Sequence, residues 1–141
     1  MTLDNRDELL LADVHRRTGV ATKEEAAHIL DAVADALGEL FTAEEARIVG
    51  PYVSDRLARL LAHSAERHSD TSGYEGFVEG IEWRENVDRT IAIEHATAVC
   101  EAIASLLPLD VRNKLRADLP AEVVAFVERA RERPEAQRGA A

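Results

Sequence analysis

The 141-residue sequence is poor in several residue types, and each scarcity excludes a class of protein. Its single cysteine rules out an internal disulfide and fits a reducing compartment. Seven glycines and four prolines are too few for the many turns of a β-sandwich. Aromatic residues make up 4% of the chain, which leaves no stacking platform for single-stranded nucleic acid. Apolar runs extend only a few residues, far below the roughly 20 that cross a bilayer.

Basic residues are also in the minority, because 17 Lys and Arg stand against 27 Asp and Glu, a net charge of −10. Affinity for nucleic acid rests on basic patches that neutralise phosphates, so we expect no nucleic-acid partner. The amino-terminal residues show no basic segment followed by an apolar stretch, and we expect neither a secretory signal nor membrane association. The composition is that of a cytoplasmic globular protein.

The most informative feature present is an internal repeat. A shift of 66 positions aligns residues 26–61 with residues 92–127 without a gap, and a shift of 67 aligns the positions upstream. The matches are mainly apolar and recur at helical spacing, for example Ala32-Val33 on Ala98-Val99. We therefore expect an all-α fold: a tandem repeat of two four-helix units packed about a pseudo-twofold axis.

The two units are predicted to share one core, since a unit of about 60 residues buries too little surface to be stable alone. We place them at about residues 7–67 and 74–131, within a single helical domain over residues 1–133. The polar stretch 68–73 is predicted to be a linker or exposed loop. Residues 134–141 are predicted to form a frayed tail.

Helix boundaries are signalled by capping residues. Thr22 with Glu25, and Thr42 with Glu45, have the spacing of capping boxes, in which each side chain satisfies the other residue's backbone N–H. Gly19 and Asn86 follow apolar helical runs and accept the left-handed conformation that ends a helix. These signals predict helices that begin near residues 22 and 42 and others that end near residues 19 and 86.

The repeated pattern resembles a known bacterial family. It combines an Ala-Val pair in the long helix, a short helix with an acidic cap, and a Leu-Pro step, which stands here as Leu119-Pro120 in the second unit. In the first unit the step is Val53-Ser54, with Pro51 upstream, so this turn departs from the pattern. Over about residues 8–128 the chain is similar to the domain-of-unknown-function family number twenty-two sixty-seven. That resemblance implies an all-helical fold and supplies no activity and no catalytic residues.

Residue patterns that could carry chemistry have simpler interpretations. Glu25 and His28 have the Glu-x-x-His spacing of di-iron bundles, but the equivalent positions of the second unit lack it, and Glu25 serves as a capping acid. His63 and His68 stand near a predicted helix end, where imidazolium is favoured by the helix dipole. Cys100 shares a face with apolar residues and is interpreted as a core residue. We therefore expect no metal, no cofactor and no catalytic residues.

A possible interaction surface is the most distinctive feature of the exposed positions. An acidic stripe follows one face of the predicted helix over residues 23–40, and a lone tryptophan stands on the helix that opens the second unit. The stripe either solvates this face or receives a basic partner, and the tryptophan either covers the seam between the units or anchors an interface. The residues of this surface are Glu24, His28, Asp31, Asp35, Glu39 and Trp83.

These observations predict a non-enzymatic protein that serves as an interaction or assembly module, with a homodimer or another protein as its partner. The alternative is a binder of small apolar ligands with a pocket at the seam between the two units. The alanine-rich faces of the two long helices would leave space for such a pocket, or would let those helices approach closely.

Overall fold

The computed structural model describes residues 5–68, 73–126 and 128, and within them every regular element is a helix. The elements are α1 (Asn5–Thr18), α2 (Lys23–Leu40), α3 (Ala43–Val49), the 3₁₀ turn η1 (Gly50–Tyr52), α4 (Asp55–Ala65), α5 (Gly73–Glu85), α6 (Arg89–Ala104) and α7 (Leu109–Arg116). Residues 121–126 are also helical. The all-α prediction is confirmed. The predicted tail (134–141) and most of the predicted linker (69–72) lie outside the described residues.

The predicted caps are present at the helix ends. The backbone N–H of Glu25 donates to Thr22 Oγ1 at 3.1 Å, and the Glu25 carboxylate accepts in return from the backbone N–H of Thr22. Thr42 and Glu45 form the same reciprocal pair at the start of α3. Asn86 has a φ of 58° directly after α5, the left-handed conformation that turns the chain toward α6. Local chemistry thus fixes where these helices begin and end.

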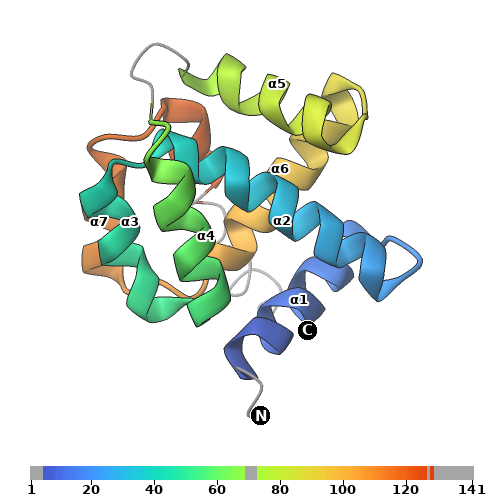
Figure 1. Cartoon of the computed structure of the whole chain (residues 1–141), viewed down its shortest axis with the longest axis horizontal. Coiled ribbons are helices and arrows are strands. Elements are labelled where there is room, and N and C mark those ends of the chain that lie inside the picture. Colours follow the sequence, from blue (N-terminus) through green and yellow to red (C-terminus); the bar gives the residue numbers. More distant parts are fainter. Residues whose placement is uncertain (1–4, 69–72, 127, 129–141) are drawn as a thin grey trace.

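The helix α2 occupies the centre of the molecule (Figure 1). It contacts α1, α4, α5 and α6. Both α1 and α5 lie against α2 and also against α6, while α3 packs on α4 and touches α7. The long helices α2 and α6 are therefore shared by the two halves of the chain.

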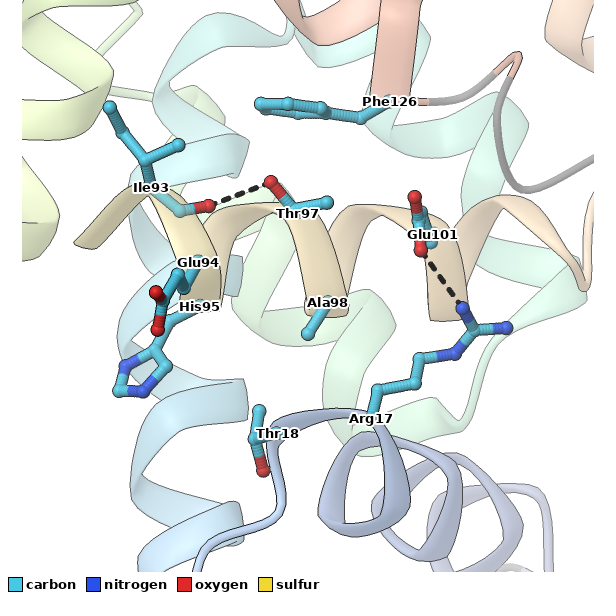
Figure 2. A pocket seen from close by; sticks show the side chains of 9 residues that line it. All are labelled: Arg17, Thr18, Ile93, Glu94, His95, Thr97, Ala98, Glu101 and Phe126. Atoms are coloured by element: carbon cyan, nitrogen blue, oxygen red, sulfur yellow. Dashed lines mark hydrogen bonds and ion pairs between the residues drawn. The ribbon is translucent and has the colours of Figure 1, made fainter. Parts of the chain in front are cut away.

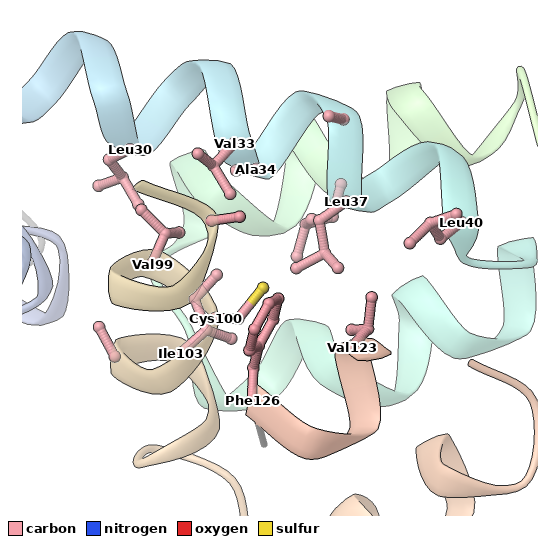
Figure 3. Packing of buried hydrophobic residues seen from close by; sticks show 14 of the residues in the cluster. Leu30, Val33, Ala34, Leu37, Leu40, Val99, Cys100, Ile103, Val123 and Phe126 are labelled. Atoms are coloured by element: carbon pink, nitrogen blue, oxygen red, sulfur yellow. The ribbon is translucent and has the colours of Figure 1, made fainter. Parts of the chain in front are cut away.

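The core lies between α2 and α6 (Figure 3). Val33 and Leu37 of α2 face Val99 and Ile103 of α6, and all four side chains are buried. The thiol of Cys100 points into the same apolar space. The remaining void beside this thiol is about 20 Å³, and residues of α7 and of the segment that follows it also line it.

Candidate functional site

Asp35 and Glu39 of the predicted acidic stripe share the same two arginine partners. Arg84 of α5 donates from Nε to Asp35 Oδ2 at 2.7 Å and from Nη2 to Glu39 Oε2 at 2.9 Å. Arg67, just beyond α4, contacts the same two carboxylates at 2.9 and 3.0 Å. Ser64 of α4 also donates a hydrogen bond to Asp35. This part of the stripe therefore ties α2 to α4 and α5.

The pairing determines the ionisation of Asp35. Burial would raise the pKa of its carboxyl, but the hydrogen bonds from Ser64, Arg84 and Arg67 outweigh burial and leave the pKa below its ordinary value. Gly80 leaves room for the Arg84 side chain, because a Cβ at position 80 would stand 2.6 Å from Arg84 Nη1. The ion pair and the glycine are thus parts of one contact between α5 and α2.

The amino-terminal part of the stripe is more open. Asp31 pairs with Arg56 at 2.8 Å, with both side chains largely in solvent. Glu24 and His28 are exposed and make no ion pair within the described part of the chain. The predicted surface therefore divides into a paired section beside α4 and α5 and an unpaired section at the start of α2.

A second buried ion pair joins α1 to α6. Arg17 donates from Nη1 to Glu101 Oε1 at 3.0 Å, and the Glu101 side chain is only 1% exposed (Figure 2). The pair lies in a groove of about 590 Å³ between these helices, whose other labelled residues include Thr18, Ile93, Thr97, Ala98 and Phe126. Thr97 donates to the backbone carbonyl of Ile93 at 2.7 Å, which satisfies its hydroxyl within α6.

A smaller groove, which we term the end groove, lies where the start of α2 meets the turn between α5 and α6. Its volume is about 410 Å³. It is lined by the apolar residues Val20, Ile29 and Val87, the glutamates Glu24, Glu25 and Glu85, and the histidines His28 and His95. No lysine or arginine is among these residues, so the lining carries an excess of negative charge.

Glu85 is the unusual member of the end groove. Its side chain is only 3% exposed, and its Oε1 lies 2.8 Å from His95 Nδ1. The other oxygen, Oε2, is buried and has no hydrogen-bond partner. Buried carboxylate oxygens are normally satisfied, and Glu85 is also the last residue of α5, where the helix dipole disfavours negative charge. The fold therefore holds this carboxylate in a place that costs stability.

Trp83 is the most exposed large apolar residue of the described part of the chain, with 84% of its surface in solvent. The interpretation that Trp83 covers the seam between the units is therefore wrong. Phe77, Val78 and Ile81 occupy the buried face of α5, and Trp83 projects away from that face. Its neighbours Glu79 and Glu82 make no ion pair with any described residue.

The remaining candidates are placed away from any reactive arrangement. Burial raises the pKa of the Cys100 thiol to about 12, with a smaller contribution from Glu101. Glu25 and His28 share the end groove, but no cluster of three or more potential ligands in the described residues is arranged to hold a metal ion. Glu25 serves as the capping acid of α2, as its spacing predicts.

Sequence reasoning missed the residues that make the end groove, Glu85 and His95, and the buried pair of Arg17 with Glu101. Asn86 was the available signal for the first two, because a left-handed residue after α5 turns the chain back and brings Glu85 toward α6. Glu101 is the repeat counterpart of Asp35 at a shift of 66, but the sequence pattern does not identify its partner.

Over the residues that the structure describes, the chain is an all-helical protein with grooves between its helices. The family described as "Uncharacterized conserved protein (DUF2267)" matches residues 7–136, and the chain belongs to this family. The resemblance read from the repeated motif is thereby confirmed. No curated protein sequence matches the chain.

Proposed function

We propose that this protein is a non-enzymatic interaction module that binds a basic segment of another protein through the outer face of α5. The observation that carries the proposal is Trp83, whose side chain stands in solvent on a well-formed helix. Tryptophan is among the residues that most often dominate binding energy when a partner covers them. Burying it on a partner supplies several times the stabilisation of a small apolar side chain.

Charge identifies the chemistry of the partner. Glu79 stands one helical turn before Trp83 on the same side of α5, and Glu82 directly precedes Trp83 on an adjacent side of the helix. A lysine or arginine placed here gains from both the carboxylates and the indole face. A second copy of this chain would bring another net charge of −10 to the contact. The same features therefore favour a basic partner over a homodimer.

The single tryptophan supplies the test. When excitation is chosen so that the two tyrosines do not absorb, the emission comes from Trp83 and should lie near that of a free indole, because the side chain is exposed. Titration with a lysine-rich peptide at low salt should shift the emission to shorter wavelength, and added salt should weaken binding. An unchanged spectrum at saturating peptide would reject the surface. A shift that depends on protein concentration without peptide would reassign it to self-association.

A matched pair of substitutions distinguishes specific binding through Trp83 from nonspecific binding to exposed apolar side chains. Trp83→Ala should weaken peptide binding, measured by calorimetry, by tenfold or more. Leu9→Ala removes another exposed apolar side chain, 63% exposed on α1, and should leave the affinity within about twofold. Equal losses from the two variants would contradict the role given to Trp83.

We also infer that the fold arose by duplication of a four-helix unit. Two of the interhelical ion pairs support this inference, since the shift of 66 brings Asp35 onto Glu101 and the shift of 67 brings Arg17 onto Arg84. Each half thus contributes one arginine to a carboxylate on the long helix of the other half. An experimental structure in which residues 7–67 fail to superpose on residues 74–126 would contradict it.

No observation favours the alternative of an apolar ligand between the two halves. Ligand pockets usually measure some 300–1,000 Å³. The apolar void that α2, α6 and α7 enclose is about 20 Å³, the size of a single water molecule's cavity. Crystals exposed to xenon, or titration with benzene followed by NMR, would reveal an apolar site if one opens.

A further inference from the structure

We propose that the end groove binds the side chain of a lysine or arginine, with Glu85 as its buried anchor. The proposal rests on the proposed function in one respect, because the basic partner segment supplies the side chain. Trp83 and Glu85 both stand in the carboxyl-terminal part of α5, so one segment can contact the outer face of this helix and enter the groove at its end.

Glu85 is a buried carboxylate with one unsatisfied oxygen, which is unfavourable for the stability of the fold. The other two acids of the groove are accounted for locally, since Glu24 and Glu25 lie in the first turn of α2, where the dipole favours them, and Glu25 completes a capping box. Glu85 lies at the end of α5 and has neither a capping role nor a favourable helix dipole. Its Oε2 lacks a donor inside the fold, and an ammonium or guanidinium group in the groove would supply one once the buried side chain turns toward the groove.

The form of the groove selects an organic cation over a metal ion. Divalent ions require several oxygen or nitrogen atoms at about 2.0–2.6 Å, and no ligand cluster of this kind exists in the described residues. The groove instead combines dispersed carboxylates with the apolar side chains of Val20, Ile29 and Val87. Lysine and arginine side chains complement this lining, because their cationic end can face the carboxylates while their apolar stem packs against the apolar side chains.

The volume and the charge agree with such a guest. About 410 Å³ accommodates one long side chain and leaves room for water. Because neither lysine nor arginine lines the groove, a guest cation meets no ammonium or guanidinium group of the protein there. The ring of His95 is held on Glu85 Oε1 at 2.8 Å, so Oε2 is the oxygen of this carboxylate that has no donor.

The test uses the described chain with N-acetyl-lysine methylamide as the probe, followed by methyl NMR. The methyl signals of Val20, Ile29 and Val87 should shift together in a saturable manner, and high salt should weaken the effect. The norleucine analogue has the same stem without the charge and should bind at least tenfold more weakly. Equal binding of the two probes would overturn the proposal, because it would show a site for apolar ligands.

Glu85→Gln tests the anchor directly and is compared with Glu66→Gln, which removes the same charge from an exposed position after α4. Glu85→Gln should reduce affinity for the lysine probe at least tenfold, and Glu66→Gln should leave it within about twofold. The melting temperature of Glu85→Gln should equal or exceed that of the wild type. Unchanged affinity with a lower melting temperature would overturn the proposal and leave Glu85 only a structural partner of His95.

Two further arms separate the failure of this inference from failure of the proposed function. Trp83→Ala should weaken the binding of a lysine-rich peptide but leave the affinity for the single-lysine probe unchanged, since only the peptide reaches the outer face of α5. Loss of the single-lysine probe in Trp83→Ala would show that the groove does not act by itself. Tighter binding of free spermidine than of the lysine-rich peptide would reassign the groove to a free amine and reject a protein partner.

Discussion

Arg84 Nε lies 2.7 Å from Asp35 Oδ2, and this contact joins two helices whose residues are 49 positions apart in the sequence. Ser64, in the last turn of α4, and Arg67, just beyond that helix, also donate hydrogen bonds to the Asp35 carboxylate. One side chain of α2 therefore holds two neighbouring helices, and its removal should be felt in both.

Asp35→Asn should destabilise the fold by about 1–3 kcal/mol at pH 7, since it removes charge-assisted hydrogen bonds from a half-buried site. The folded pKa of Asp35 is below its ordinary value of 3.8, so this stabilisation is present above that pH and is lost as pH falls through the folded pKa. Urea denaturation followed by circular dichroism should show the difference at pH 7 shrinking at pH 3. Asp31→Asn is the control, with an expected cost below about 1 kcal/mol because its ion pair is exposed.

Gly38→Ala should destabilise the fold by roughly 1–3 kcal/mol, despite the better helix propensity of alanine. A Cβ on Gly38 would stand 2.6 Å from Ser64 Cβ and 3.0 Å from the backbone oxygen of Leu61, so α4 would have to move away from α2. At Gly50 the nearest atom would be Ala58 Cβ at 3.5 Å, an ordinary contact. Gly50→Ala should therefore be neutral or slightly stabilising in thermal melts. Equal effects of the two substitutions would contradict the close approach.

Glu45→Gln should remove a pH dependence of stability. Burial and the facing carboxyl of Asp118 raise the folded pKa of Glu45 above 4.5, so its contribution to stability is full below that pH and is lost as pH rises through the folded pKa. The melting temperature of the wild type should fall relative to Glu45→Gln over this window. Glutamine keeps the acceptor for the Thr42 backbone N–H, which lies 2.9 Å from Oε1 of Glu45. Asp118→Asn should reproduce the effect; if it does not, the facing charge is not the cause.

Cys100 should react very slowly with thiol reagents in the native protein. Burial raises its thiol pKa to about 12, so the fraction of reactive thiolate at pH 8 is small, and the apolar neighbours exclude the reagent. A disulfide reagent monitored by absorbance should label the native chain at least about a hundredfold more slowly than the urea-unfolded chain, because labelling requires opening of the core. Similar rates in the two states would place the thiol at the surface.

The features that the sequence predicted well are those determined within a few neighbouring residues. The capping boxes of Thr22 with Glu25 and of Thr42 with Glu45 involve side chains three positions apart, and Asn86 is left-handed as its place after an apolar run indicates. The all-helical fold followed from apolar spacing, which a helix imposes on its own buried face.

The candidate site was less predictable because it depends on how helices cross. Apolar periodicity identifies the buried face of α5 but does not determine which carboxylate of α2 its arginine reaches, since this depends on the crossing angle and the rotation of each helix. The exposure of Trp83 has the same origin: its position lies off the apolar face, and only the packing shows that no neighbour covers it. Glu85 needs both the left-handed turn and the crossing of α5 with α6.

The central place of α2 has a consequence for the way the molecule opens. Because α1, α4, α5 and α6 all rest on this helix, the amide protons in its middle turns have no route to solvent through the loss of a single neighbour. Deuterium should enter those turns only when the chain unfolds as a whole, whereas the outer helices can fray one at a time. The amide protons that exchange most slowly would then all belong to α2.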